Sequence, residues 1–418
     1  MNDEADLPDS AQRLPLSRAT LHAALRRPLR VALFSGNYDC VRDGANQALN
    51  RLVAYLLDKV RAEVRIYSPT APRKAFESVG DIRSVRSISI PGRPEYRVAL
   101  GFPRATQQDF DGFAPDIVHL SAPDLLGRQA QKYALARGIP IVASLHTRFE
   151  TYLDYYRLSF LRGPVDRYLD RFYGDCASIL CPTLPIAREM GERFGTDRTA
   201  IWGRGIDPAC FRPGLRDPAL RTQLGYTAED MVPLFFGRLV LEKGLGVFAE
   251  AVEAVRAQGL AVRPLIIGEG PARNWLAQRL PNATFMGHLT GAALGRAVAS
   301  ADMLINPSVT EAFGNVNLEA MASGLAVISA DVPSASALIE DGRTGLLVPA
   351  RNAAAYAAAA AALIRQPHRR AILGAAAAET AARHRWDDVL EDVVRSYAHV
   401  LRIPFPAISL VTAQAQAA

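Results

Sequence analysis

The sequence has little cysteine and no long apolar run, and each shortage excludes a class of protein. The four cysteines, Cys40, Cys176, Cys181 and Cys210, show none of the paired spacings that bind zinc or staple a small secreted domain. We therefore expect reduced thiols with a structural role, as in a cytosolic protein. No apolar stretch approaches the roughly 20 residues that a membrane-spanning helix requires.

Both terminal segments are expected to lie outside the folded domains. Residues 1–27 are polar and contain arginine, without the apolar centre of a signal peptide. We expect 1–27 and the last segment, 405–418, to be disordered, although 17–26 has the composition of a short helix.

Excess charge is also limited. The 48 Lys and Arg residues exceed the 42 Asp and Glu residues by six, which is modest for 418 residues. A net charge of +6 suits a polyanionic ligand or an anionic membrane surface without establishing either. The hydrophobic content of 49% is that of an ordinary globular protein, and the length predicts two domains.

A regular alternation of apolar runs and helical patterns fills most of the chain. Continuous apolar runs, as opposed to alternating ones, are typical of parallel strands that are covered on both faces. The runs lie at 29–35, 115–120, 139–145, 177–182, 198–203, 231–237, 262–268, 301–307 and 325–330.

The alternation stops at 203–218, which is rich in Gly, Pro and Arg and has the composition of a linker. We therefore predict an α/β fold with two Rossmann-like parallel-sheet domains of similar size, joined near 204–218. The predicted parts are a disordered segment, an N-terminal domain, a C-terminal domain, a C-terminal helix for which the first domain is a candidate partner, and a disordered tail, at 1–27, 28–205, 206–385, 386–404 and 405–418.

The stretch "PSVTEAFGNVNLEAMASG" (307–324) carries two glutamates, Glu311 and Glu319, with seven positions between them. Glu311 follows a predicted strand, where ligands of open α/β sheets bind. A helix begins near Gly314, and the free N–H groups of a helix start attract phosphate. The segment thus offers a hydrogen-bond acceptor, then a cluster of hydrogen-bond donors, then a second hydrogen-bond acceptor. This order fits a sugar, a diphosphate and a ribose. Two solvated glutamates, or the acid and base of a glycoside hydrolase, are the alternatives.

Two further loops favour a nucleotide sugar. In "FFGRLVLEKGLG" (235–246), Arg238 and Lys243 follow a strand, and two cations there suit a diphosphate. The segment "IIGEGP" (266–271) is a similar loop after the next strand. A hydrolase needs no diphosphate clamp.

The sequence resembles the family 4 retaining glycosyltransferases of the GT-B fold. The resemblance rests on "GRLVLEKG", "IGEGP", "FMGHL", "EAFGNVNLEAMASG" and "GRGIDPACFRP", with looser matches at "DGANQALNRL" and "SLHTRFETY". It implies the GT-B arrangement, in which an acceptor-binding domain (28–205) and a donor-binding domain (206–385) face a central cleft. It also implies that the chain moves a sugar from a nucleotide-diphosphate sugar with retention of configuration.

The resemblance also implies residue roles. Arg238 and Lys243 would grip the diphosphate, Glu311 would face the sugar hydroxyls and Glu319 the ribose. Main-chain amides of Phe313, Gly314 and Asn315 would meet sugar and phosphate oxygens, Gly287 would lie at the base, and Gly44 would approach the diphosphate from the first domain. His146 matches the family histidine near the reacting sugar. The predicted catalytic residues are therefore His146, Glu311, Arg238 and Lys243.

The family mechanism makes Glu311 an orienting carboxylate and not a nucleophile, with the leaving phosphate assisting a same-face displacement. We expect no cofactor and no metal ion, because two cations suffice for the leaving group. The single glycine of "CVRDGANQ", where many relatives have two, is a departure that bears on phosphate geometry.

The acceptor is expected to bind the first domain. The segment 148–173 holds eight aromatic residues and five arginines, a composition typical of membrane interfaces. The candidate acceptor or membrane residues are Arg148, Tyr152, Tyr155, Tyr156 and Arg157. A helical pair that packs its aromatic residues against the domain is the alternative.

Similarity to lipid-glycosylating members predicts glycolipid synthesis by a cytoplasmic enzyme peripheral to the inner face of the cell membrane. Donors in that subgroup include mannose, glucose, glucuronate and sulfoquinovose nucleotides. The main rival is transfer to a soluble or polyprenyl-linked glycan. An NAD-dependent oxidoreductase is a weaker alternative, since 35–44 lacks Gly-x-Gly-x-x-Gly. A non-catalytic glycan-binding relative is also weaker, since the donor-site positions of the second domain are all intact. We expect no nucleic-acid partner. The base, the sugar and the oligomeric state do not follow from the sequence.

Overall fold

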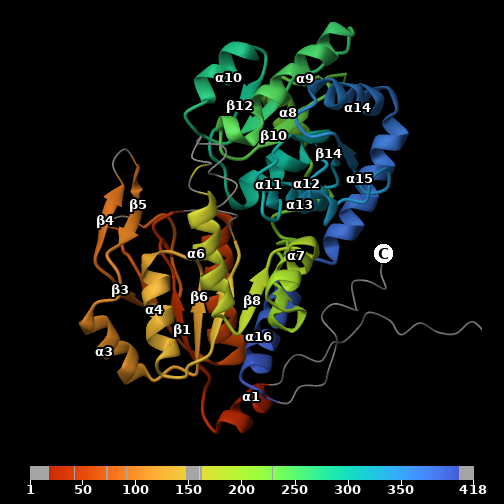
Figure 1. Ribbon diagram of the computed structural model, residues 1–418. Helices are drawn as coiled ribbons and strands as arrows, with labels where there is room; N and C mark the ends of the chain where they lie inside the picture. Colours follow the sequence, from red (N-terminus) through yellow and green to blue (C-terminus); the bar gives the residue numbers. More distant parts are fainter. Residues whose placement is uncertain are drawn as a thin grey trace, which may run out of the picture. The chain divides into compact units, whose positions relative to one another are not determined.

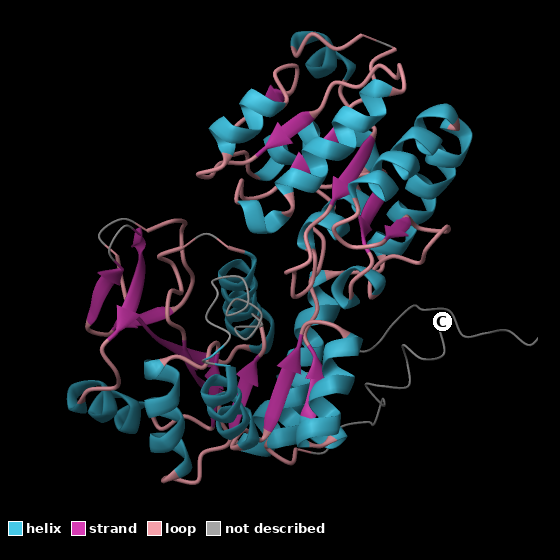
Figure 2. Cartoon of the chain, turned by 45° about the horizontal axis from the view of Figure 1, so that its top comes forward, coloured by secondary structure: helices cyan, strands magenta, loops and turns pink. Residues whose placement is uncertain are grey.

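The computed structural model describes residues 18–41, 43–71, 74–90, 93–146, 160, 162–227 and 229–403. The chain divides into two compact units. The first comprises Met1–Ser144, Arg171–Leu180 and Leu390–Ala418, and the second comprises Leu145–Asp170 and Cys181–Val389. Each unit contains strands covered by helices (Figures 1 and 2).

A seven-stranded sheet has the order β3-β2-β1-β6-β7-β8-β9. Its strands are β1 (Arg30–Phe34), β2 (Glu63–Ser68), β3 (Asp81–Ser84), β6 (Ile117–Leu120), β7 (Ile141–Ser144), β8 (Ser178–Cys181) and β9 (Thr199–Ile201). The pairings from β3 to β8 are parallel. Strands β6, β7 and β8 are buried at every position, which explains their continuous apolar runs.

The helices of this part are α1 (Arg18–Leu25), α2 (Gly44–Tyr55), the π-helix η1 (Leu56–Val60), α3 (Arg104–Phe113), α4 (Leu125–Leu135), α6 (Arg162–Gly174) and α16 (Trp386–Val400). Asp43 and Asp124 cap α2 and α4 by accepting a hydrogen bond from the N–H of Asn46 and of Gly127. Helix α1 lies within 17–26, the part of 1–27 for which a short helix was the alternative to disorder, and its Leu21 is fully buried. Residues 1–17 and the predicted tail 405–418 lie outside the described residues.

Strands β4 (Ser87–Ile90) and β5 (Arg93–Ala99) form a separate antiparallel pair in the first unit (Figure 1). The sequence patterns did not predict this hairpin.

The second unit holds a six-stranded parallel sheet of order β12-β11-β10-β13-β14-β15. Its strands are β10 (Pro233–Phe236), β11 (Leu265–Ile267), β12 (Thr284–Phe285), β13 (Met303–Asn306), β14 (Ala326–Ala330) and β15 (Leu346–Val348). From β10 the chain runs outward to β12 and then returns to β13 on the other side of β10. This reversal places a topological switch point between β10 and β13.

The α-helices of this unit are α7 (Leu184–Phe194), α8 (Pro218–Gln223), α9 (Leu245–Ala257), α10 (Arg273–Arg279), α11 (Gly291–Ala299), α12 (Asn315–Ala322), α13 (Pro333–Ser336), α14 (Ala353–Arg365) and α15 (Pro367–Ala382). Short 3-10 helices with bounds inside the described residues are η3 (Thr196–Arg198), η4 (Pro213–Leu215) and η5 (Leu241–Lys243).

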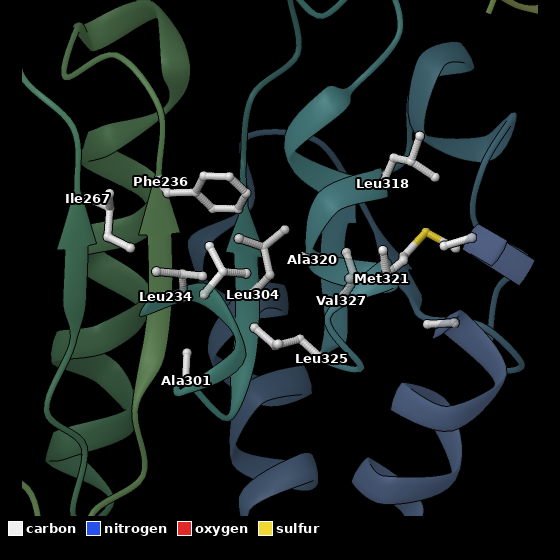
Figure 3. Close-up of a cluster of buried hydrophobic side chains, with 14 of the residues drawn as sticks. Leu234, Phe236, Ile267, Ala301, Leu304, Leu318, Ala320, Met321, Leu325 and Val327 are labelled. Carbon is white, nitrogen blue, oxygen red and sulfur yellow. The ribbon is translucent and has the colours of Figure 1, made fainter. Parts of the chain in front are cut away.

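Alternate residues of these strands enter two different cores. In β10, Leu234 and Phe236 belong to one buried cluster and Phe235 to another. Figure 3 shows the first cluster, in which Leu234 and Phe236 lie near other strand residues, with Leu318 and Met321 of α12 on the helix side. Both faces of the sheet are therefore apolar, as the predicted doubly wound fold requires.

Candidate functional site

Two loops leave the carboxyl ends of β10 and β13, the neighbouring strands at the switch point of the second sheet. The first carries Lys243 and the second Glu311. The Lys243 Nζ atom lies 2.6 Å from Glu311 Oε1, in an ion pair whose side chains are 24% and 23% exposed. Two residues that are 68 positions apart in sequence are thus brought together where open α/β sheets bind ligands.

Arg238 follows the same strand β10 and is exposed. Among the described residues its guanidinium makes no hydrogen bond or ion pair, whereas Lys243 is already paired with a carboxylate. The loop therefore offers one uncommitted cation and one cation that is held by an acid.

Helix α12 begins directly after Glu311's loop. Its N-cap, Gly314, has a φ of 96°, a left-handed conformation that glycine adopts without strain. The first main-chain N–H groups of the helix, at Asn315 and beyond, lack intrahelical acceptors. Within the described part of the chain, Asn315 Oδ1 and Ser308 Oγ are also buried without a hydrogen-bond partner. Such orphaned polar atoms suit a polar ligand at this loop.

Glu319 lies in the second turn of α12 and its side chain is partly exposed. Burial among neighbouring atoms raises the pKa of Glu319 to about 8. The carboxyl group of the ligand-free chain is therefore largely protonated at neutral pH, and it can both donate and accept a hydrogen bond.

A buried polar network fixes the carboxyl end of β13. Asn306 Nδ2 donates to Asn317 Oδ1 over 2.9 Å, and Asn317 Nδ2 donates to Ser329 Oγ over 3.1 Å. The N–H of Ser308 donates to Asn306 Oδ1 over 3.2 Å. Strands β13 and β14 and helix α12 are thereby joined beneath the loop that carries Glu311. Sequence reasoning gave Asn306 and Asn317 no role, although both are polar residues inside otherwise apolar runs.

The loops after β10, β11 and β12 approach one another through glycines. Gly237 donates its N–H to the carbonyl of Ile267, and Gly268 donates to the carbonyl of Gly287 over 2.7 Å. Gly268 has a φ of 135°, and a Cβ atom there would lie 1.9 Å from the carbonyl oxygen of Gly237. Only glycine fits this position, which places Gly287 and the loop of Arg238 on the same edge of the sheet.

His146 follows β7 and belongs to the second unit. Its Nδ1 lies 3.0 Å from Nη2 of Arg204, and its ring packs edge-on against Trp202 with centroids 4.6 Å apart. A guanidinium only donates hydrogen bonds, so Nδ1 accepts and the ring proton resides on Nε2. Sequence reasoning missed Arg204 because it lies in a segment with linker composition.

Arg204 also contacts the loop before α12. It is 5% exposed, donates to the carbonyls of Trp202 and Gly203, and its guanidinium carbon lies 5.9 Å from the ring centre of Phe313. One buried arginine therefore contacts both His146 and the residue next to Gly314.

The other predicted site residues are placed as follows. Gly44 is the first residue of α2, in the first unit. The candidate acceptor residues Arg148, Tyr152, Tyr155, Tyr156 and Arg157 lie outside the described residues. In the described ranges, no cluster of three or more His, Cys, Asp or Glu side chains is placed to hold a metal ion. No helix in the same ranges is both long and apolar enough to cross a membrane.

Comparison with known proteins supports a family assignment. A family model described as "Glycosyltransferase Family 4" matches residues 42–209, and one described as "Glycosyl transferases group 1" matches residues 231–366. The chain is 30% identical over 377 residues to a GDP-mannose-dependent alpha-mannosyltransferase of Mycolicibacterium smegmatis, covering 89% of this chain and 98% of that protein.

A second relative supports the family, and a solved structure supports the fold. A phosphatidyl-myo-inositol mannosyltransferase of Mycobacterium leprae is 29% identical over 360 residues, covering 82% of this chain and 91% of the relative. The structure of Anabaena Alr3699/HepE in complex with UDP-glucose superposes with a TM-score of 0.66 at 17% identity, covering 88% and 99% of the two chains. The fold is accordingly GT-B, and the chain belongs to the family 4 glycosyltransferases.

Proposed function

We propose that the chain transfers a sugar from a nucleotide-diphosphate sugar to a membrane lipid, with retention of anomeric configuration. The observation that carries the donor half is the Lys243–Glu311 ion pair at the switch point of the second sheet. It unites a cation suited to a diphosphate with a carboxylate suited to sugar hydroxyls. The names of the M. smegmatis relative and the UDP-glucose complex support a nucleotide-sugar donor.

The residues of the second unit divide the work on the donor. Arg238 and Lys243 neutralise the diphosphate, which makes the nucleoside diphosphate a better leaving group. Main-chain amides of Phe313, Gly314 and Asn315 at the α12 start bind sugar and phosphate oxygens. Glu319 hydrogen-bonds the ribose, and the backbone at Gly287 borders the base.

Glu311 exchanges partners in this proposal. In the ligand-free chain it neutralises Lys243, and when the donor binds the diphosphate takes over Lys243. The released carboxylate then accepts hydrogen bonds from the sugar and favours the positive charge that develops at the anomeric carbon. The proton on Nε2 of His146 makes that nitrogen a donor toward a sugar or phosphate oxygen. No metal ion enters this scheme.

The lipid acceptor rests on relatives. The M. leprae protein is named for a phosphatidyl-myo-inositol substrate. A lipid acceptor together with a nucleotide-sugar donor places the proposed reaction at the inner face of the cell membrane. Transfer to a soluble or polyprenyl-linked glycan is the alternative for the same chemistry.

A two-step experiment tests the proposal. A thermal-shift screen of UDP-glucose, GDP-mannose and ADP-glucose identifies the donor, because a ligand at 100 times its Kd stabilises the fold by about 2.7 kcal/mol. Nucleotide release with that donor is then measured with diacylglycerol vesicles, phosphatidylinositol vesicles or soluble oligosaccharides as acceptor. Turnover with oligosaccharides alone would refute the lipid acceptor, and binding of NAD with no sugar nucleotide would refute the donor.

A further inference from the structure

The β4–β5 hairpin of the first unit turns its apolar face outward. Ile88 of β4 pairs with Val98 of β5, and residues directly opposite each other in an antiparallel pair share a face. Ile90 and Leu100 follow Ile88 and Val98 by two residues, which turns their side chains to the same side of their own segments. Leu100 lies just beyond the end of β5, and the register of the pair shifts between Ser89 and Ile90. The side chains of Ile88, Ile90, Val98 and Leu100 are 56%, 38%, 43% and 55% exposed. We call this the outer face.

The opposite face of the hairpin is polar and only partly buried. Arg97 pairs with Ser89, and its guanidinium donates to Ser87 Oγ over 2.8 Å and to Ser89 Oγ over 3.2 Å. Ala99, which pairs with Ser87, is buried, whereas Ser89 is exposed. The polar side chains of this face therefore satisfy each other, while the aliphatic side chains of the outer face meet solvent without a partner of their own kind.

The hairpin is fixed to the edge of the first sheet where a ligand of this unit is expected. Asn37, in the loop after β1, accepts from the N–H of Arg97 over 2.8 Å and donates to its carbonyl over 3.2 Å. Strand β1 borders β6 at the switch point of that sheet. The outer face therefore projects from a hairpin that is pinned to the carboxyl edge of β1.

A basic side chain accompanies the apolar ones. The N–H of Leu100 donates to the carbonyl of Arg86, so Arg86 continues the outer face next to Leu100. Arg86 is exposed and makes no ion pair with a described residue, whereas the nearby Arg83 is paired with Asp81 and Asp109. Aliphatic side chains beside a cation without an acidic partner complement the acyl chains and negative headgroups of an anionic bilayer.

A stable protein interface uses roughly 20–30 residues on each side, which these two short strands do not supply. A bilayer requires no matching shape, and apolar contact together with basic charge provides the two signals of reversible membrane attachment. We propose that the outer face of the β4–β5 hairpin docks the protein on an anionic lipid bilayer. The link from this docking to acceptor delivery rests on the proposed function, whereas the docking itself does not.

Vesicle flotation of the full chain tests the docking. The probe is vesicles of equal parts phosphatidylglycerol and phosphatidylcholine, compared with phosphatidylcholine alone. The double variant Ile88→Ser, Leu100→Ser should bind the anionic vesicles at least tenfold more weakly than the wild type. Arg86→Gln should lose part of the binding to anionic vesicles, and raised salt should remove the difference between Arg86→Gln and wild type. Ile372→Ser, in α15 with 54% exposure, is the matched control and should bind as the wild type does.

The two proposals fail in different ways. Wild-type flotation by the double variant overturns the docking surface even if glycolipid synthesis stands. Conversely, a wild-type chain that binds vesicles through the hairpin but glycosylates only soluble glycans refutes the lipid acceptor and leaves the docking intact. Light scattering identifies the other occupant, since a dimer that the double variant abolishes would show that a second copy covers the outer face and would overturn bilayer docking. Equal melting temperatures of the variants establish that all are folded.

Discussion

At the scale of residues, the charge of the candidate site depends on close neighbours. Lys243 forms an ion pair with Glu311, whereas burial raises the pKa of Glu319 and disfavours its ionised form. Sequence position alone predicted that the cationic loop and Glu311 would share an edge, because both follow strands of one sheet. It did not predict the partner of His146, because Arg204 belongs to a segment without periodicity.

Glu311→Gln replaces the carboxylate by an isosteric amide and should lower kcat by at least about 100-fold, because a preorganised charge at the reacting sugar is lost. The melting temperature should change little, since partly exposed ion pairs contribute about 1 kcal/mol or less. Intact-mass spectrometry during turnover should show no glycosyl-enzyme in the wild type or the variant. A trapped adduct would make Glu311 a nucleophile. Glu340→Gln, at an exposed pair with Arg343, is the control.

Glu319→Gln should change how stability depends on pH. Glu319 ionises near pH 8 when folded and near its ordinary value of 4.5 when unfolded, so between these values the folded state binds the extra proton. Wild-type stability should therefore fall as pH rises from about 4.5 to 8, and the amide should remove this part of the fall. Thermal melts at pH 5 to 9 measure it. A variant whose advantage does not grow toward pH 8 would contradict the raised pKa.

Arg204→Met should allow the imidazole of His146 to change its tautomer. Loss of the donor to Nδ1 allows the proton to move there, which ¹⁵N NMR of the imidazole detects, with His146→Gln assigning the signal. We expect kcat to fall about tenfold or more while the KM for the donor changes little, because Arg204 acts through His146. Arg204→Lys tests whether charge without the planar fork suffices. Unchanged imidazole shifts would show that Arg204 is merely structural.

At the scale of elements, continuous apolar runs predicted nine strands, and the structure has a strand in each run. The missed strands of the two sheets are β2, β3, β12 and β15. Strand β2 is mostly buried, but Glu63 and Arg65 interrupt its apolar run. β3 has exposed or half-exposed side chains, β12 has only two residues, and β15 has three. The hairpin was missed because its alternation of serine and isoleucine, Ser87 to Ile90, places the apolar residues on the exposed side. Short edge strands bury too little to leave a sequence signal.

Gly268→Ala should destabilise the second unit by about 2 kcal/mol or more, because a positive φ and a close carbonyl oppose the added methyl group. The distorted loop should also weaken stabilisation by the donor nucleotide in the thermal-shift assay. Gly246→Ala, in helix α9, is the matched control, since no atom lies within 4 Å of a Cβ atom added there. That substitution should be neutral or stabilise by about 0.5–1 kcal/mol. Equal melting of the two variants would contradict the crowding at Gly268.

At the scale of the whole molecule, helix α16 belongs to both units. Trp386 to Val389 group with the second unit, and residues from Leu390 onward group with the first. Tyr397 OH contacts Nδ1 of the buried His119 at 2.5 Å, and Ser396 contacts Ser178 at 2.9 Å. The sequence predicted an amphipathic helix here and named the first domain as its candidate partner, but the buried histidine carried no signal of its own.

A chain that ends at Arg385 should lose the folded first unit. His119, whose pKa burial lowers to about 3, would lose its tyrosine partner, and the apolar side of α16 would leave part of the first core uncovered. Limited proteolysis should then cut the first unit while nucleotide still protects the second. The milder variant Tyr397→Phe should cost roughly 1–3 kcal/mol, against none for the exposed His399→Ala. A protease-resistant first unit in the shortened chain would contradict this role.

The path of α16 has a consequence for how the protein is made. N-terminal domains generally fold first as a chain leaves the ribosome. Here the buried His119 and Ser178 of the first unit find their partners in Tyr397 and Ser396, which follow them by 278 and 218 residues. A nascent chain therefore completes its first unit only after residues 181–389 of the second unit have been translated.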